Sequence, residues 1–224
     1  MDVMRVGMVT IGQSPRIDLV PEIKKLIPIG IEVIEKGALD GLSLKEVEKF
    51  EPDEDDVCFV TRMRDGTEVT IGRSHILPRL QERIYELDQE GVEVIALLCS
   101  GEQPRFQSES PLIRPVELQA GVLSSISIKN KLGVMVPLER QIGSCIETFQ
   151  RLGFRTVAVA ASPYKHDEKG IVEAAEELTG QIDLIFMNCM GYTLEMKRKV
   201  KEITGKPVIL VRSLLARMLG ELLS

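Results

Sequence analysis

The chain has 224 residues, of which 44% are hydrophobic and 28% charged, and this composition excludes a disordered, collagen-like or coiled-coil protein. The net charge of −6, the aromatic content of 4% and the absence of tryptophan argue against a surface that binds nucleic acid. No apolar run approaches the roughly 18 residues of a membrane span, and residues 1–7 lack the apolar core of a signal peptide, so we expect a cytoplasmic protein without a membrane partner.

Short apolar runs alternate with helical stretches along the chain, a pattern typical of strands that are buried on both faces of a parallel sheet. The expected strands are residues 5–11, 31–36, 57–63, 68–71, 94–99, 131–136, 156–161, 184–189 and 208–211. The expected helices are residues 15–26, 43–50, 74–90, 114–127, 138–152, 168–178, 193–204 and 213–222. The sequence therefore predicts an α/β fold with mostly parallel sheets.

One segment departs from this alternation. The strands at 57–63 and 68–71 flank Arg64-Asp65-Gly66-Thr67, and Asp-Gly between two alternating runs is a strong hairpin signal. We therefore expect a β-hairpin appended to the first α/β unit.

The chain contains two halves with similar landmarks. Each half opens on an apolar-Gly strand, at Gly7 and at Gly133, and each has a late apolar strand that ends in Cys-x-Gly, at Cys99 and at Cys189. A proline-marked segment near residues 110–115 separates the halves. We expect two Rossmann-like lobes: residues 1–115 with a C-terminal helix at 208–224, and residues 116–207.

The two matched cysteines are the first candidates for chemistry. Cys99 and Cys189 are expected at the carboxyl ends of strands, where open α/β sheets bind ligands, and the glycine that follows each lets the backbone approach a ligand. A thiolate and a thiol that flank one carbon acid can remove a proton and return it from the opposite side, which requires no cofactor. The alternative is that both cysteines are small core residues.

The remaining cysteines and the histidines do not suggest a metal. Cys58 and Cys145 are assigned to packing, and the four cysteines form no CxxC pair. His75 and His166 are too few and too scattered for a metal centre. We therefore expect neither a metal nor another cofactor.

The turn after the first strand is a candidate anion site. Ser14 resembles a helix N-cap, and Pro15 the first residue of the helix. The N–H groups of the turn, the Ser14 hydroxyl and the Arg16 guanidinium could hold a carboxylate or a phosphate. The alternative is a helix start without a further role, and neither nucleotide-binding glycine motif is present.

Further polar residues lie near expected strand ends. His166 could act as an acid, a base or a partner that activates a thiol, or it could be an exposed loop residue. The residues that flank the cysteines and could orient a polar substrate are Ser100, Gly101, Gln103, Arg105, Asn188, Gly191 and Tyr192.

Three segments together resemble the AroM family, and the likeness runs over essentially the whole chain. They are Thr10-Ile11-Gly12-Gln13-Ser14-Pro15-Arg16-x-Asp18, Leu98-Cys99-Ser100-Gly101 and Asn188-Cys189-Met190-Gly191-Tyr192. AroM proteins look like distant relatives of the Asp/Glu/hydantoin racemase superfamily, whose members have two α/β halves and one cysteine from each half at a cleft.

The resemblance implies catalytic roles for Cys99 and Cys189 and a substrate-carboxylate region from Gln13 to Arg16. The chain departs from amino-acid racemases, in which Asn-Thr follows the first cysteine and Thr-His the second. Here Ser100-Gly101 and Met190-Gly191 stand in those places. Arg16 suggests a more acidic substrate.

Two functions follow from these observations. The first is a cofactor-independent racemase, isomerase or carbanion-forming lyase that acts on a small carboxylate, held by Gln13, Ser14 and Arg16, with backbone amides near Gly101 and Gly191 at the enolate oxygen. The second is a non-catalytic sensor or carrier of a small organic anion on the same fold. A structural or partner-binding protein is a third reading without a supporting motif. A homodimer would be ordinary for this size.

Overall fold

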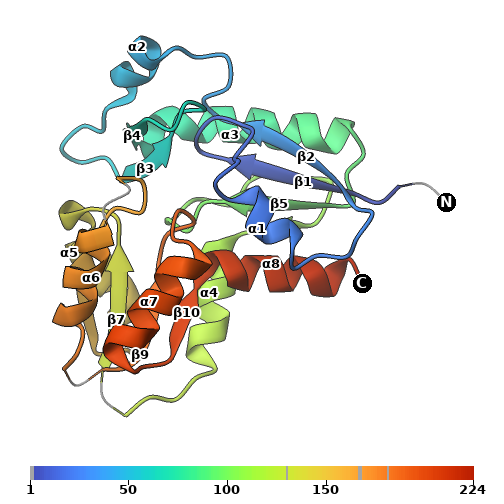
Figure 1. The fold of residues 1–224 in the computed structure, drawn as a ribbon. Helices are drawn as coiled ribbons and strands as arrows, with labels where there is room; N and C mark the ends of the chain where they lie inside the picture. The colour runs from blue at the N-terminus through green and yellow to red at the C-terminus, as the bar shows by residue number, and fades with distance from the viewer. Residues whose placement is uncertain (1–2, 130, 166–167, 181) are drawn as a thin grey trace. The chain divides into compact units, whose positions relative to one another are not determined.

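We analysed a computed structural model that describes residues 3–129, 131–165, 168–180 and 182–224. The chain divides into two compact units (Figure 1). The first unit runs to Val116 and includes Leu215–Ser224, and the second comprises Glu117–Leu214. Each unit is built around its own parallel sheet.

The sheet of the first unit has four strands in the order β2-β1-β5-β6, and all of its pairings are parallel. Its central strands are apolar along most of their length and buried, which explains why they were visible as apolar runs. The strands are β1 (Arg5–Thr10), β2 (Glu32–Gly37), β5 (Val94–Leu98) and β6 (Leu112–Ile113).

The longest helix, α3 (Arg73–Gln89), packs along this sheet (Figure 1). Four of its apolar residues are buried at helical spacing, namely Ile76, Leu80, Ile84 and Leu87. They share a core with strand residues and with the hairpin. The shorter helices are α1 (Val20–Lys24), α2 (Leu44–Val47) and the 3-10 turn η1 (Glu48–Phe50).

The expected hairpin is confirmed. Strands β3 (Cys58–Arg62) and β4 (Glu68–Gly72) pair antiparallel, with Phe59 opposite Ile71. The turn places Gly66 at φ +98°, a left-handed conformation that glycine adopts at little cost.

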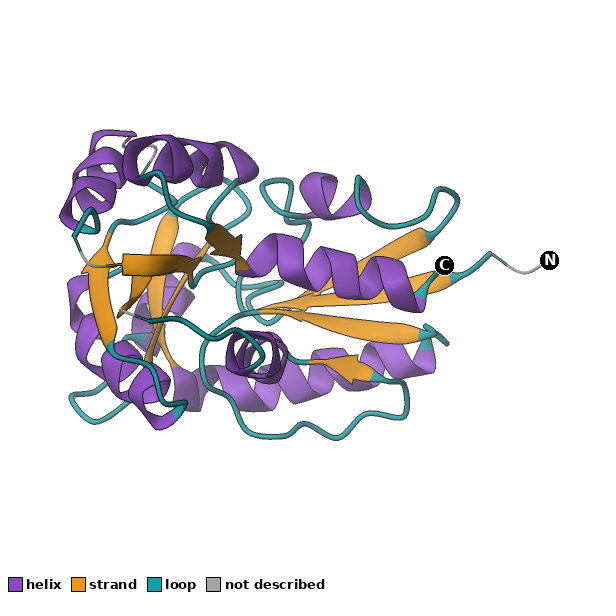
Figure 2. Ribbon diagram, turned by 90° about the horizontal axis from the view of Figure 1, so that it is seen from below, coloured by secondary structure: helices purple, strands orange, loops and turns teal. Residues whose placement is uncertain are grey.

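The sheet of the second unit has the order β10-β9-β7-β8 and is also parallel throughout. Helices flank the strands of each unit (Figure 2). The strands are β7 (Lys131–Val136), β8 (Thr156–Ala160), β9 (Ile182–Met187) and β10 (Val208–Leu210). The helical elements are α4 (Pro115–Ser124), η2 (Glu139–Gln141), α5 (Ile142–Arg151), α6 (Glu168–Glu177) and α7 (Leu194–Thr204). The last helix, α8 (Val211–Leu222), begins in this unit and belongs to the first unit from Leu215 onward.

The two units share one strand topology once the hairpin is set aside. In each, the first strand is central, the second lies on one side of it, and the third and fourth follow on the other side. Two glycines confirm this match. A Cβ on Gly7 would meet Leu87 at 3.0 Å and Ile95 at 3.3 Å, and a Cβ on Gly133 would meet Leu178 at 3.2 Å and Ile185 at 3.4 Å.

One local prediction was wrong, and one short strand was not predicted. The helix expected over residues 15–26 is only α1 (Val20–Lys24), because backbone N–H groups of the preceding segment bind the carboxylates of Asp40, in the loop after β2, and of Glu35, in β2, instead of starting a helix. Ser14 is therefore not an N-cap, and its bond to Pro15 is cis. The proline-marked join contains strand β6, which has two residues and was too short to recognise.

Candidate functional site

The first cysteine loop, residues 99–107, begins directly after β5. Because Leu98 lies opposite Thr10 in the parallel register, Cys99 follows at the carboxyl edge of the sheet. Its side chain is 7% exposed and belongs to the apolar core of the first unit, together with Ile11 and Phe59.

Gly101 of this loop presses against an aromatic ring. A Cβ at Gly101 would lie 2.6 Å from Cε1 of Phe59, so a larger residue could not occupy the position without moving the ring. The glycine of the Cys-x-Gly motif therefore permits a close approach between the loop and hairpin strand β3.

Two side chains of α3 form hydrogen bonds with the backbone at the end of this loop and in the segment after it. Gln81 makes two hydrogen bonds with the backbone of Gln107, at 2.7 and 2.8 Å. Asp88 accepts hydrogen bonds from the backbone N–H groups of Glu109 and Ser110. Burial on its own raises the pKa of Asp88, but these hydrogen bonds outweigh it and hold the pKa below its ordinary value.

The turn after β1 is tied to its neighbours by its own side chains. The Gln13 amide donates to the carbonyls of Leu39 and Leu42 and accepts from the Arg64 N–H. The Ser14 hydroxyl and N–H both donate to the Asp40 carboxylate, at 2.6 and 2.7 Å.

Arg16 is also engaged internally. Its guanidinium is 2% exposed, forms a bidentate ion pair with Asp18 at 2.8 and 2.9 Å, and donates to Thr10 Oγ1 at 2.8 Å. Burial raises the pKa of Asp18, but the hydrogen bond and charge of Arg16 outweigh burial and keep the pKa below its ordinary value. An anion at this turn would have to displace these partners, so the contacts give the Gln13–Arg16 side chains a structural role.

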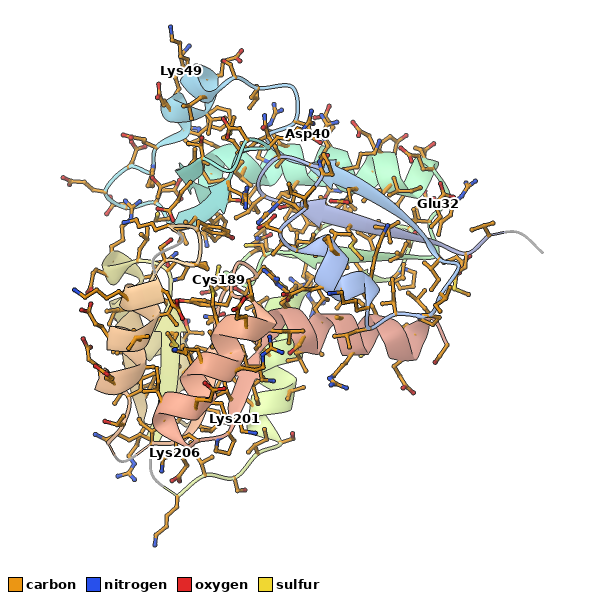
Figure 3. All side chains as sticks on the ribbon, viewed as in Figure 1. Glu32, Asp40, Lys49, Cys189, Lys201 and Lys206 are labelled. Atoms are coloured by element: carbon orange, nitrogen blue, oxygen red, sulfur yellow. The ribbon has the colours of Figure 1, made fainter. Side chains whose placement is uncertain are left out.

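The second cysteine loop, residues 188–193, follows β9, and Figure 3 marks Cys189 within it. The thiol is 7% exposed. The Gly191 N–H donates to Sγ of Cys189 at 3.3 Å, and Oη of Tyr164 lies 3.9 Å from the same sulfur, within hydrogen-bonding distance for sulfur. Cys189 therefore has two potential proton donors at its sulfur.

Gly191 repeats the packing of Gly101. A Cβ at Gly191 would lie 2.6 Å from Cζ of Tyr164 and 2.6 Å from Cγ of Pro163. In both units, then, the glycine two residues after the cysteine is held against a ring, and only glycine fits.

Arg212, near the start of α8, forms hydrogen bonds with the backbone of the second cysteine loop. Its guanidinium is 1% exposed and donates to the carbonyls of Met190, at 2.8 Å, and Gly191, at 2.9 Å. The Met190 carbonyl and the Gly191 N–H belong to one peptide group and point in opposite directions when it is trans. Arg212 therefore orients the same peptide group that donates to the sulfur of Cys189.

The other residues expected near Cys189 have structural partners. The Tyr192 side chain is fully buried and donates its hydroxyl to the Ala161 carbonyl at 2.7 Å. Burial, together with the neighbouring Cys189, Tyr164 and Cys145, raises the pKa of Tyr192 well above its ordinary value. Burial also raises the pKa of Cys145 to about 12, although a hydrogen bond with the Asn188 side chain acts in the opposite direction.

Sequence reasoning missed Tyr164 and Arg212. Tyr164 lies in the polar segment after β8. The residue predicted to be functional in this segment was His166, which lies outside the described residues. Arg212 is 22 residues from Met190, and no local pattern links the two. Within the described ranges, no group of three His, Cys, Asp or Glu side chains could hold a metal ion, and no helix is long and apolar enough to cross a membrane.

Solved structures with the same fold are racemases and isomerases. Allantoin racemase from Pseudomonas fluorescens has a TM-score of 0.69 at 14% identity, covering 98% of this chain and 90% of that one. Aspartate racemase from Picrophilus torridus has a TM-score of 0.61 at 15% identity, with coverage of 97% and 93%. The maleate isomerase Iso from Pseudomonas putida S16 has a TM-score of 0.63 at 15% identity, with coverage of 99% and 93%.

These likenesses show that the chain shares the α/β fold of those enzymes. No curated protein matches the chain significantly in sequence. The model of the AroM protein family matches residues 6–223, nearly the whole length. The chain therefore belongs to the AroM family, as its opening motif and its two cysteine loops suggested.

Proposed function

We propose that this protein is a cofactor-independent racemase or isomerase of a small carboxylate, with Cys99 and Cys189 as its paired acid and base. The observation that carries the proposal is the setting of Cys189, a buried thiol with a backbone N–H at 3.3 Å and a phenol at 3.9 Å. Cys99 is its counterpart after the equivalent strand, β5, of the other unit. The racemases, isomerases and decarboxylase among the solved structures of this fold support this class of function.

In this proposal Cys189 is the base. Hydrogen bonds from Gly191 and Tyr164 favour its thiolate over its thiol. Arg212 strengthens the effect, because a cation at the Met190 carbonyl polarises the peptide group whose N–H faces the sulfur.

Cys99 supplies the acid. In this proposal its sulfur carries a proton when the substrate binds. The Cys189 thiolate removes the proton from the substrate carbon, and the electron pair moves into the adjacent carboxylate as an enediolate. Cys99 then returns a proton to the opposite face and becomes a thiolate itself. Backbone amides near Gly101 are assigned to the enediolate oxygen.

Exchange of the substrate Cα proton for deuterium in heavy water tests the proposed proton abstraction without knowledge of the product. We expect the wild-type protein to exchange the Cα proton of at least one small carboxylate in a panel of amino, hydroxy and dicarboxylic acids, followed by proton NMR. Cys189→Ala should reduce exchange by at least about a hundredfold, since general acid–base groups contribute factors of this order. Cys99→Ala should reduce inversion at Cα by a similar factor, while Cys189 still exchanges the proton on its own face.

Cys58→Ala is the matched control, because Cys58 lies in the hairpin. It should exchange at the wild-type rate. Full exchange by Cys189→Ala would reject the role of Cys189 as base. The proposal requires both thiols to contact one substrate carbon. Cross-linking of Cys99 to Cys189 by a short bifunctional thiol reagent would support this requirement independently.

The second candidate is a sensor or carrier of a small organic anion. The observation that favours it is that residues expected to contact substrate, including Gln13, Arg16 and Tyr192, have their hydrogen-bonding groups engaged within the protein. This reading predicts saturable anion binding that survives replacement of both cysteines, without proton exchange over long incubation. Calorimetric titration of the double variant separates the two candidates.

A further inference from the structure

The side chain of Gln103, four residues after Cys99, is buried without a hydrogen-bond partner. It is 6% exposed, and neither Oε1 nor Nε2 is paired with any described residue. Leaving both ends of a buried amide unsatisfied is costly, and folded proteins rarely do so without a ligand or an ordered water. The amide therefore has hydrogen-bonding capacity that the described residues do not use.

The loop around Gln103 is fixed on both sides. Gly101 abuts the ring of Phe59, so the chain before Gln103 cannot shift toward the hairpin. After it, the Pro104 carbonyl accepts a hydrogen bond from Arg114 at 3.2 Å, and the Gln107 backbone is bonded twice to Gln81. Because these contacts hold the loop in place, the Gln103 side chain cannot easily move to the surface and form hydrogen bonds with water.

We propose that Gln103 binds the substrate and selects a carboxylate that also carries a neutral carboxamide or ureido group. The inference rests on the proposed function, which places a small carboxylate at Cys99. A side-chain amide presents one acceptor and two donors. A second carboxylate on the ligand would pair with Nε2 but set its other oxygen against Oε1. A carboxamide or a ureido group offers a donor and an acceptor together and satisfies both ends.

Three probes of nearly the same size test this preference: succinate, succinamate and N-carbamoylglycine. Binding is measured by calorimetric titration of the wild-type protein, Gln103→Leu and Gln103→Glu. We expect succinamate or N-carbamoylglycine to bind the wild-type protein at least about tenfold more tightly than succinate, the ratio that one hydrogen bond supplies. Gln103→Leu should bring this ratio to about one, whereas Gln103→Glu should keep it, because a carboxylate accepts from the N–H groups of a carboxamide or ureido group and repels a second carboxylate.

Thermal unfolding of the ligand-free variants separates a binding role from a structural one. Gln103→Leu should unfold at or above the wild-type temperature, because it removes an unsatisfied buried amide. Gln13→Leu is the control, since the Gln13 amide is hydrogen-bonded at both ends, to the carbonyls of Leu39 and Leu42 and to the N–H of Arg64, and it should unfold at a lower temperature.

Three results would overturn the inference. They are an unchanged probe ratio in Gln103→Leu, a fall in its unfolding temperature equal to that of Gln13→Leu, or no binding of any probe to the wild-type protein. A fall in temperature would assign the amide to a bound structural water. Proton exchange is followed in the same samples, so loss of the probe preference with exchange intact rejects only the role of Gln103. Probe binding without exchange rejects only the catalytic proposal.

Discussion

Hydrogen-bond donors around Cys189 support its proposed role as the base. A backbone N–H and a phenol lie within hydrogen-bonding distance of its sulfur. Such donors stabilise a thiolate, so this sulfur is suited to accept a proton. Cys99, in the core of the first unit, is the proposed proton donor.

Arg212 is expected to control the protonation of Cys189 through the peptide group between Met190 and Gly191. Arg212→Met removes the cation and both carbonyl contacts, so Cys189 should need a higher pH to react with iodoacetamide, and its rate at pH 7 should fall about tenfold. Arg212→Lys should recover part of the rate. Peptide mass mapping across pH measures both.

Arg217→Met is the control, because Arg217 lies on the same helix and is exposed. Its labelling profile should match that of the wild-type protein. If Arg212→Met lowers the unfolding temperature but leaves the pH profile of Cys189 unchanged, Arg212 serves packing alone.

Cys145 should remain unlabelled in the same experiment. Burial raises its pKa to about 12, so the thiolate is scarce at neutral pH, and its side chain is buried. We expect no Cys145 adduct at pH 7 in the native protein and full labelling after denaturation. Rapid native labelling of Cys145 would contradict its assignment to packing.

At the scale of elements, the polar residues of the turn after β1 form hydrogen bonds and an ion pair that connect neighbouring segments. Gln13, Ser14 and Arg16 connect this turn to the loop after β2, to the hairpin and to Asp18. Their side chains bring three segments together beside the sheet edge. Such a segment reads from sequence like an anion site, because the same donor groups serve both purposes.

The Arg16–Asp18 pair predicts a defined loss of stability in acid. The folded pKa of Asp18 lies below its ordinary value, so its stabilising contribution is present above about pH 4 and is lost as pH falls through the folded pKa. Asp18→Asn leaves a buried guanidinium without its bidentate partner and should destabilise the protein at pH 7 by about 3 kcal/mol. Urea unfolding at pH 7 and pH 3 measures both effects.

Two outcomes are informative. The difference between Asp18→Asn and the wild-type protein should shrink at pH 3, where the wild-type carboxyl begins to take up its proton. A difference of the same size at both pH values would show that the aspartate acts through its shape or its hydrogen bonds and not through its charge.

At the scale of the whole molecule, the sequence was sufficient to predict the α/β class, the hairpin and the repeated halves. Apolar strands such as β1 and β5 are buried on both faces, so their identity does not depend on distant contacts. The site was less accessible. The partners of Arg16 and Arg212 come from folded geometry, and the unpaired state of Gln103 is visible only when every neighbour is known.

The division of the chain also bears on its synthesis. The second unit, Glu117–Leu214, is inserted between the bulk of the first unit and its last segment, Leu215–Ser224. A ribosome therefore releases every residue of the inserted unit before the remainder of α8 emerges. The first unit is completed only when Leu215–Ser224 has been made, since Leu215 and Leu219 of this segment are buried. Its folding therefore depends on a segment synthesised after the whole of the inserted unit.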